Sequence, residues 1–402
     1  MKIAIFSDTF LPQLNGVTTT VYQSAKSLAS LGHEVIIFTV ARDAKKYIDP
    51  NIRNLKIVSL PNMPALIYPS LRFTLPLGFS FNKIRKFKPD IIHSHTPFAV
   101  GLEAVICSKL LKIPLVGTHH TFYDHYLKYV KLDYKWGKNF SWKCTVGYYN
   151  QCDLVLSPTQ SLADALTKQG LKKPVVILQN SIDMNLFKPV PDLNFKKRLK
   201  QRYGIKGASL IFEGRLGYEK SIDQVIKALC LMLKKMPDLK LMLAGDGPEK
   251  NNLEKLAAEL KIKDNIIFTG CIPYGKDVVE AYQANDIYIT ASKSENMPVA
   301  ILEAMSCGLP IIAVKERGLT ELIKDNANGF FVKTDNPADM TQKTLSLLAD
   351  PDLLTKFSQA SRTLAMEYSN EKVTDLLIKS YEKTIKEYPA KKDSQKINLK
   401  TI

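Results

Sequence analysis

The sequence has no run of eighteen apolar residues, so we expect no segment of the chain to span a membrane. Its start, Met1–Asp8, is a short apolar stretch interrupted by polar residues and does not have the pattern of a signal peptide. The six cysteines show no C-x-x-C spacing, which predicts reduced, mostly buried thiols rather than disulfides or zinc ligands. These absences predict a cytoplasmic protein.

Acidic residues are few relative to basic ones, and the formal net charge is +17. Residues 1–190 carry 23 lysines and arginines against 11 aspartates and glutamates, so most of the excess lies in the N-terminal half. A basic field of this size attracts anionic surfaces, either lipid headgroups or nucleic acid. The sequence has no recognised nucleic-acid-reading motif, so we expect no nucleic-acid partner.

Short apolar stretches alternate with helical patterns along the chain, which predicts an α/β protein with two doubly wound parallel sheets. We expect domains at residues 1–188 and 189–366, a helix over 367–388, and a disordered polar tail over 389–402. The predicted strands are residues 2–7, 34–40, 55–60, 90–94, 115–118, 154–157 and 175–178 in the first domain, and 210–214, 240–244, 266–269, 287–290 and 311–313 in the second.

A pair of glutamates, Glu295 and Glu303, follows the apolar stretch Ile287–Ala291. Pro298 suits the first position of a helix that ends near Ser306, so Glu295 falls in the loop at the strand's carboxyl end. Ligands bind at those carboxyl ends in open α/β sheets. The alternative is a chance pair on a solvated helix face.

Two basic residues, Arg215 and Lys220, follow another predicted strand and precede a helix that we expect to begin at Ser221. Gln224 completes a Ser-x-x-Gln capping box there. A helix N-terminus with two cations favours an anion such as a phosphate or diphosphate. A solvated face is the simpler reading of either cluster alone, but the two clusters together favour a binding site.

The N-terminal domain offers two further candidates. Asn15 and Gly16 lie in the loop after the first strand, where both can adopt positive φ and let the backbone approach a ligand, although an ordinary βα loop is the alternative. His119 and His120 follow the strand over 115–118, where a single histidine is more often structural. The H-x-H at residues 93–95 is a weak metal pattern because it has no carboxylate partner.

These motifs resemble those of one enzyme family, the retaining nucleotide-sugar glycosyltransferases of family 4. The resemblance covers about residues 1–388 in the right order, and it implies the GT-B fold, with two Rossmann-like domains facing each other across a cleft. The segments that carry it are residues 179–189, 214–220, 245–249 and 294–310.

The resemblance implies a role for each charged candidate. Glu295 would hydrogen-bond the hydroxyls of the donor sugar, and Glu303 would take the ribose hydroxyls. Arg215 and Lys220 would neutralise the leaving diphosphate. His120 would contact the donor sugar, whereas His119 would only pack.

Backbone groups complete the implied donor site. The family usually has a Gly-Gly pair in the first loop, so the contact to the donor phosphates would rest on Gly16 alone here. The uracil of UDP-glucose is the expected base, with GDP-mannose as the alternative donor. The amides expected to hold the sugar are those of Asn296, Met297 and Val299, and the base is expected near Cys271 and Ile272.

The chemistry implied by the resemblance is transfer with retention and without a metal. Metal-dependent transferases often hold Mg²⁺ or Mn²⁺ on an Asp-x-Asp motif, and the only such sequence here, Asp350–Asp352, is expected to cap a late helix. Protein cations would stabilise the diphosphate instead.

The acceptor is suggested by two segments rich in apolar and basic residues. Residues 61–88 place apolar side chains beside Lys83, Arg85, Lys86 and Lys88, which describes either an interfacial membrane anchor or an ordinary crossover helix. Residues 126–138 interleave aromatics with lysines, and the pattern over 121–127 is similar to that of bacterial diacylglycerol glucosyltransferases. The resulting hypothesis is a lipid acceptor such as 1,2-diacylglycerol, with the enzyme peripheral at the inner face of the cell membrane; the alternative is a soluble acceptor.

Overall fold

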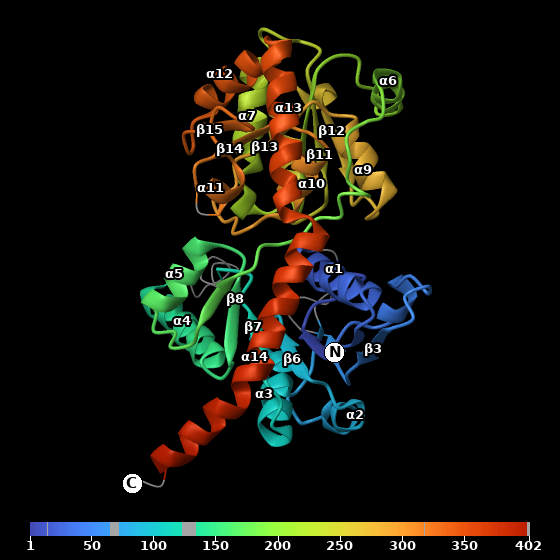
Figure 1. Ribbon diagram of the computed structural model, residues 1–402. Coiled ribbons are helices and arrows are strands. Elements are labelled where there is room, and N and C mark those ends of the chain that lie inside the picture. The colour runs from blue at the N-terminus through green and yellow to red at the C-terminus, as the bar shows by residue number, and fades with distance from the viewer. Residues whose placement is uncertain (14, 65–71, 123–133, 317, 400–402) are drawn as a thin grey trace. The chain divides into compact units, whose positions relative to one another are not determined.

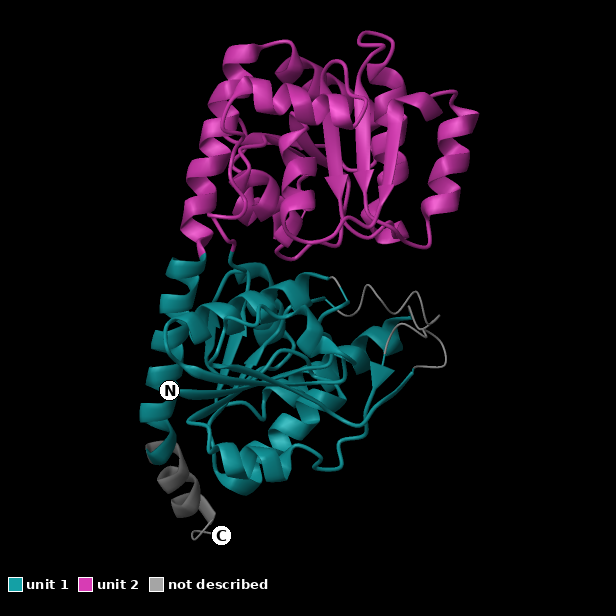
Figure 2. Ribbon diagram, turned by 90° about the vertical axis from the view of Figure 1, so that its right-hand side faces the viewer, with its two compact units in different colours: residues 1–181, 370–402 teal, residues 182–369 magenta. Residues whose placement is uncertain are grey.

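The computed structural model describes residues 1–402 except 14, 65–71, 123–133, 317 and 400–402, and it describes no side chains beyond residue 389. The chain forms two compact units, residues 1–181 with 370–402 (unit 1) and residues 182–369 (unit 2), which Figure 2 colours separately. The sequence placed the boundary at 188/189, seven residues too late, because the turn and loop over 182–192 pack with unit 2.

Unit 1 is built on a seven-stranded sheet with the order β3-β2-β1-β6-β7-β8-β9, in which every pairing is parallel. The strand β1 lies between β2 and β6, with Ile5 paired to Ile37 on one side and to His93 on the other. The strands are β1 (Lys2–Ser7), β2 (Glu34–Thr39), β3 (Leu55–Ser59), β6 (Ile91–Ser94), β7 (Leu115–Thr118), β8 (Leu154–Ser157) and β9 (Val175–Ile177), and a separate two-stranded ribbon pairs β4 (Met63–Pro64) with β5 (Arg72–Phe73).

Alternation along β1 divides the core of unit 1 between the two faces of its sheet. Ile3 and Ile5 pack with helices α1 and α14, whereas Ala4 and Phe6 pack with α2, α3 and α4. The helices of this unit are α1 (Gly16–Ser30), α2 (Phe81–Phe87), α3 (Ala99–Leu111), α4 (Lys135–Tyr149), α5 (Gln160–Lys168) and α14 (Asn370–Leu399), with a 3₁₀ turn η1 at Ala44–Tyr47.

The C-terminal helix α14 returns the chain to unit 1 and lies beside α1 (Figure 1). Its buried residues Val373, Leu377 and Tyr381 belong to the same core as Ile5. The helix continues through Pro389 to Leu399, so the structure has helix over most of the tail that the sequence predicted to be disordered.

Unit 2 is built on a six-stranded parallel sheet with the order β12-β11-β10-β13-β14-β15. The strands are β10 (Ser209–Glu213), β11 (Lys240–Ala244), β12 (Ile266–Gly270), β13 (Ile287–Thr290), β14 (Ile311–Val314) and β15 (Gly329–Val332), the last of which the sequence did not predict. The helices are α6 (Leu193–Arg202), α7 (Ile222–Met232), α8 (Lys250–Glu259), α9 (Lys276–Gln283), α10 (Val299–Ser306), α11 (Leu319–Leu322), α12 (Pro337–Leu348) and α13 (Pro351–Ala365), with 3₁₀ turns η3 (Tyr218–Lys220), η4 (Lys263–Asn265) and η5 (Met366–Tyr368).

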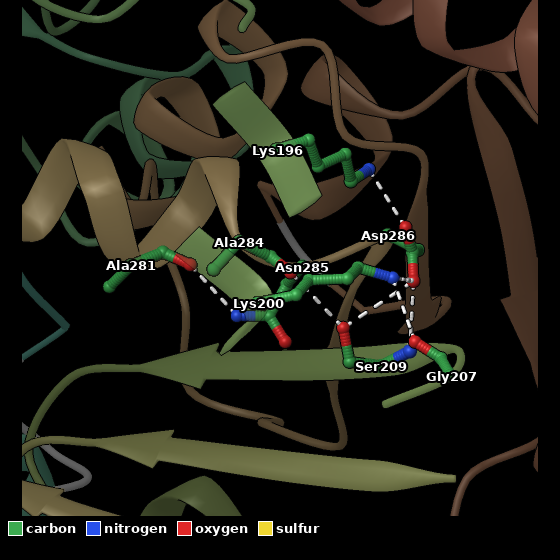
Figure 3. Close-up of polar contacts among 8 residues, drawn as sticks. All are labelled: Lys196, Lys200, Gly207, Ser209, Ala281, Ala284, Asn285 and Asp286. Atoms are coloured by element: carbon green, nitrogen blue, oxygen red, sulfur yellow. Dashed lines mark hydrogen bonds and ion pairs between the residues drawn. The ribbon is translucent and has the colours of Figure 1, made fainter. Parts of the chain in front are cut away.

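A partly buried ion cluster around Asp286 ties α6 to the amino-terminal edge of this sheet (Figure 3). The Asp286 carboxylate accepts from the ammonium groups of Lys196 at 2.7 Å and Lys200 at 2.6 Å, and from the backbone N–H of Ser209 at 2.9 Å. Burial alone would raise the pKa of Asp286, but the two ammonium groups outweigh it and lower that pKa below its ordinary value. The first helix of unit 2 is thereby fixed to the starts of β10 and β13.

We expect Asp286→Ala to lower the free energy of unfolding by about 3 kcal/mol, because it leaves two largely buried ammonium groups without their carboxylate. The control is Asp223→Ala, which breaks the exposed Asp223–Lys227 pair on α7 and should cost less than about 1 kcal/mol. Urea unfolding followed by far-UV circular dichroism measures both. An equal decrease in the free energy of unfolding for the two variants would contradict the role of Asp286 in anchoring α6.

Candidate functional site

The loop after β10 is held against the loop after β11 by glycines. Gly245 has φ 151°, and a Cβ at this position would lie 1.9 Å from the carbonyl oxygen of Gly214. The close approach allows the backbone N–H of Leu216 to donate to the oxygen of Asp246 at 3.0 Å. The segment that carries Arg215 and Lys220 therefore has a fixed course at the carboxyl edge of the sheet.

The start of α7 differs from the sequence prediction. Ser221 has φ 49°, in the left-handed region, and its side chain makes no capping hydrogen bond, while the Gln224 amide donates to Asp223. An N-cap side chain needs extended backbone to reach the helix N–H groups. Because Ser221 closes the preceding 3₁₀ turn instead, the predicted capping box does not form.

Lys220 and Glu295 meet at the carboxyl edge of the sheet. The Lys220 ammonium lies 2.5 Å from Glu295 Oε1, and the two side chains are only 17% and 15% exposed. Lys220 comes from the turn after β10 and Glu295 from the loop after β13, and these two strands are neighbours. Arg215, in the same segment as Lys220, is exposed.

Glu303 lies buried in α10 beside two residues that the sequence analysis missed, Glu213 and Tyr282. The Tyr282 hydroxyl lies 2.9 Å from Glu303 Oε2 and 3.2 Å from Glu213 Oε2. Burial raises the pKa of Glu213 to about 7, although Tyr282 and the Lys220 ammonium act in the opposite direction. Burial and the charge of Glu213 raise the pKa of Glu303 as well.

One signal for Glu213 was present in the sequence. It is the only charged residue of the strand Ser209–Glu213, at its carboxyl end. Tyr282 lies on α9, and nothing in the spacing of residues linked that helix to Glu303.

The remaining candidates of unit 2 lie on loops and one helix start. Pro298, predicted at the first helical position, is the N-cap of α10, with φ −70° and ψ 123°. Cys271 and Ile272 directly follow β12, and Cys271 is exposed. Three of the expected sugar-binding residues are buried around the start of α10: Asn296, Met297 and Val299.

In unit 1, His93 at the end of β6 joins three elements. Its Nδ1 lies 2.6 Å from the hydroxyl of Tyr381 on α14, and its Nε2 lies 2.7 Å from Oγ1 of Thr118 on β7. Burial lowers the pKa of His93 to about 3, with a smaller contribution from His120. This imidazole is therefore neutral and serves to join the strand edges to α14.

His120, the histidine expected to contact the donor, is hydrogen-bonded to His95. The Nε2 of His120 lies 3.0 Å from His95 Nδ1, and burial lowers the pKa of His120 to about 4. One ring must donate and the other accept, since both are neutral at pH 7. His119 packs against the rings of Tyr149 and Trp142.

The first loop of unit 1 differs from the prediction for Asn15 and Gly16. Neither residue has positive φ: Asn15 is extended, with φ −157°, and Gly16 begins α1. The Asn15 side chain instead caps the helix by accepting from the N–H of Thr18 at 2.9 Å. Gly16 thus lies at the exposed N-terminus of a fifteen-residue helix, which favours an anion without left-handed backbone.

Metal-binding geometry is absent from the described residues, in which no three histidine, cysteine, aspartate or glutamate side chains are placed to hold an ion. His93 and His95 are instead used by the hydrogen bonds above. The Asp350 side chain accepts from the N–H of Leu353 at 2.9 Å, which confirms the predicted helix cap on α13.

Comparisons with known proteins agree with this arrangement. The family described as "Glycosyl transferases group 1" matches residues 195–364, and "Glycosyltransferase Family 4" matches residues 14–186. An alpha-monoglucosyldiacylglycerol synthase of Streptococcus pneumoniae is 31% identical over 88% of this chain and 80% of its own length. This chain belongs to the group 1 and family 4 glycosyltransferases.

Other relatives of this glycosyltransferase differ in their printed activities. An Acholeplasma laidlawii alpha-monoglucosyldiacylglycerol synthase is 28% identical over 92% of this chain and 94% of its own. A Corynebacterium glutamicum GDP-mannose-dependent alpha-mannosyltransferase is 28% identical over 83% and 76%. An Anabaena protein solved with UDP-glucose has a TM-score of 0.78 at 19% identity, covering 95% of this chain and 100% of that one, which confirms the predicted GT-B fold.

The segments proposed to meet a membrane are only partly described. Residues 65–71 and 123–133 lie outside the described residues. Around α2, Lys83, Arg85, Lys86 and Lys88 are all exposed, while Ile84 is fully buried in the core. The preceding stretch of the glycosyltransferase exposes apolar side chains at Phe73, Leu75, Leu77 and Phe79.

Helix α4 exposes an apolar surface, of which the sequence analysis named only the part within residues 126–138. Trp136 and Phe140, one turn apart, are each 63% exposed, and the adjacent Tyr134 is equally open. Lys135 and Lys143 are exposed on the same helix. Helical spacing from Trp136 could have identified Phe140 as part of this surface.

We expect His93→Gln to flatten the acid dependence of stability in unit 1. Because the pKa of His93 is about 3 in the folded protein and near 6.5 when unfolded, His93 stabilises the fold fully above pH 6.5 and progressively less as the pH falls. Below pH 6, the free energy of unfolding of the variant should fall by about 1.4 kcal/mol less per pH unit than that of the parent. Both tryptophans, Trp136 and Trp142, lie in α4 and report unfolding of this unit by fluorescence.

A matched control for this measurement is His33→Gln, since His33 is only half-buried and should change the slope less. If the free energy of unfolding falls by the same amount between pH 6 and pH 5 in His93→Gln and in the parent, His93 is not held neutral in the folded protein.

Proposed function

We propose that this glycosyltransferase moves glucose from UDP-glucose to a membrane lipid such as 1,2-diacylglycerol. The observation that supports a nucleotide-sugar donor is that Lys220, Glu295 and Glu303 lie at the carboxyl edge of β10 and β13. Open α/β sheets bind ligands at this edge. The names of two relatives, both alpha-monoglucosyldiacylglycerol synthases, support a lipid acceptor.

In this proposal the Lys220–Glu295 ion pair binds both the sugar and the diphosphate of the donor. Glu295 orients the donor by accepting from sugar hydroxyls, and its partner Lys220 stabilises the charge that develops on the leaving diphosphate with Arg215. Glu303 accepts from the ribose hydroxyls, and the base lies near Cys271 and Ile272.

From unit 1, the proposal assigns Gly16 and His120 to the donor. Gly16 supplies backbone at a helix N-terminus for the phosphates. His120 supplies a neutral hydrogen-bonding ring for the sugar, because burial keeps it uncharged at working pH. His120 therefore binds and orients the sugar without carrying charge.

We further propose retention of configuration and independence of metal. Support comes from the carboxylates: Glu295 is bound by Lys220, and Glu303 is turned toward Tyr282, so neither resembles the pair that flanks the scissile bond in retaining glycosidases. The only Asp-x-Asp sequence is occupied in capping α13. The acceptor would then attack from the face that the diphosphate leaves.

We expect Lys220→Ala and Arg215→Ala each to slow glucosyl transfer at least about a hundredfold, since each removes a cation from the leaving group. Initial rates with saturating diacylglycerol measure this, and Lys227→Ala, on the exposed part of α7, is the control that should retain the parent rate.

The same assay in excess EDTA tests independence of metal, and NMR of the anomeric proton of the product tests retention of configuration. Parent-like turnover in both variants would exclude the diphosphate assignment, and an inverted linkage would exclude retention.

The membrane part of the proposal rests on exposed apolar and basic side chains of unit 1. Leu77 is 67% exposed between Phe73 and α2, and Trp136 and Phe140 project from α4. Apolar side chains beside lysines are typical of proteins that bind the interface of an anionic bilayer. We propose a peripheral association at the inner face of the cell membrane. Among the described residues no helix is long and apolar enough to cross a bilayer.

One observation favours the alternative of a soluble acceptor. Ile84 is fully buried and α2 packs on α3, as an ordinary crossover helix does. In that case the four basic residues form a solvated face, and a sugar or small metabolite would replace the lipid. GDP-mannose stays the alternative donor because a relative is named for it.

We expect changing Lys83, Arg85, Lys86 and Lys88 together to Ser to remove roughly 4 kcal/mol of binding to anionic vesicles at low salt, about 1 kcal/mol for each cation. Sedimentation with vesicles of anionic or neutral lipid measures it, and added salt should weaken the parent's binding. The control changes four exposed cations of unit 2 to Ser: Lys255, Lys263, Lys276 and Lys324. If the first variant sediments like the parent, α2 is a crossover helix and the soluble acceptor is favoured.

A further inference from the structure

Three side chains of unit 2 form a largely buried chain of hydrogen bonds next to the proposed donor site. Tyr282 Oη lies 3.2 Å from Glu213 Oε2 and 2.9 Å from Glu303 Oε2. Glu213 ends β10, Tyr282 lies on α9 and Glu303 lies on α10, so three separate elements meet at the phenol. We call these three residues the carboxyl–tyrosine relay.

The number of protons in this relay follows from its geometry. A phenol has one proton, so Tyr282 can donate to only one of the two carboxyl groups. The other contact is a hydrogen bond only if that carboxyl group is protonated and donates to the phenol oxygen. Two hydrogen bonds therefore require one proton in addition to that of Tyr282.

The surroundings make the extra proton favourable. Two ionised carboxylates at one buried phenol would repel each other without the water that normally solvates them. Burial and both glutamates raise the pKa of Tyr282 well above its ordinary value, so the phenol keeps its own proton. The Lys220 ammonium, which lowers the pKa of Glu213, contacts Glu295 at 2.5 Å.

Other titratable groups that face the relay come from each neighbouring element. The Tyr288 hydroxyl on β13 donates to the backbone oxygen of Glu213 at 3.2 Å, and the thiol of Cys307, after α10, faces Glu303. Burial raises the pKa values of both groups, so both are neutral near pH 7. The charged groups of the surroundings are Lys220 on η3 and Glu295 on the loop after β13, which form an ion pair.

We propose that Glu213 is a positioning residue that holds one proton on the relay, so that Glu303 meets the donor ribose as a hydrogen-bond acceptor. The Glu213 carboxyl O–H donates to Tyr282 Oη, and the Tyr282 O–H donates to Glu303 Oε2. This leaves Glu303 Oε1 to accept from a ribose hydroxyl. The inference rests on the proposed role of Glu303 in binding the nucleotide.

A consequence is that nucleotide binding depends on pH. A bound nucleoside displaces water from the carboxyl edge, which disfavours the doubly ionised relay further. The nucleotide should therefore bind the singly protonated relay and lose affinity as the relay loses its proton. Because burial raises the pKa of Glu213 to about 7 and raises the pKa of Glu303 as well, the loss should begin at or above pH 7 and approach tenfold for each further pH unit.

The experiment measures the Kd of UDP by calorimetry between pH 7 and pH 8.5, where most of the terminal phosphate is ionised, because its last pKa is near 6, and most of the uracil N3–H keeps its proton. The parent should weaken toward tenfold per pH unit. Glu213→Gln should keep the pH 7 affinity and show a flat profile, because its amide N–H donates to Tyr282 at every pH. Glu259→Gln, which changes an exposed carboxylate at the end of α8, is the control and should follow the parent.

A second measurement needs no variant of Glu213 and no ligand. The carbonyl stretch of a protonated carboxylic acid, seen by infrared spectroscopy, should be present in the parent at pH 7 and decrease toward pH 9. Tyr282→Phe should shift this titration, since it removes the shared phenol. A flat parent profile, or no protonated carboxyl at pH 7, would overturn the relay.

The inference and the proposed function fail in different ways. If Glu303→Gln binds UDP and 2′-deoxy-UDP as the parent does, Glu303 does not bind ribose, and the proposed role of Glu303 is wrong. The protonated carboxyl of the parent would still be observed in that case. If Glu303→Gln weakens UDP while the parent titrates no carboxyl, the ribose role stands and the relay is refuted.

Discussion

Parallel pairing of β10 with β11 on one side and β13 on the other is the constraint on which the candidate site depends. Parallel strands end at the same edge of a sheet, so the segments after β10 and β13 emerge side by side. Lys220 and Glu295 meet for this reason although they are 75 residues apart. At the opposite edge, Asp286 binds the lysines of α6 and fixes the starts of the same two strands. The position of the site is thus set at both ends of β10.

The sequence predicted the strands well because fully buried parallel strands are continuous apolar runs, and Leu241–Ala244 is one example. It did not predict β15, whose first residue is a glycine that fits because a Cβ there would lie 2.0 Å from the oxygen of Ile311. Local rules failed at Ser221, where a tertiary turn imposed left-handed backbone on a residue with the composition of a cap. Tyr282 could not be predicted because only the folded sheet places α9 beside Glu303.

The polar interiors of the two units are held in different ways. In unit 1, neutral imidazoles pair with hydroxyl groups and with each other, as in the contacts of His93 with Thr118 and Tyr381. In unit 2, the Glu295 carboxylate is bound by an ammonium group, and the carboxyl groups of Glu213 and Glu303 lie around a phenol. A buried neutral network provides direction without charge, whereas paired charges also set the local potential. In the proposed function, His120 binds the sugar as an uncharged ring, whereas Glu295 accepts from the sugar hydroxyls as a carboxylate and Lys220 brings positive charge to the diphosphate.

Unit 1 is assembled from two segments of chain, residues 1–181 and 370–402, with the whole of unit 2 between them. During synthesis, the ribosome therefore completes residues 182–369 before it makes α14. The contacts of Leu377 and Tyr381 with the core of unit 1, and the hydrogen bond of Tyr381 to His93, can therefore form only after unit 2 has been translated. A chain that stops before residue 370 would expose the sheet face that α14 covers, so the cell would have a truncated product that quality control can recognise.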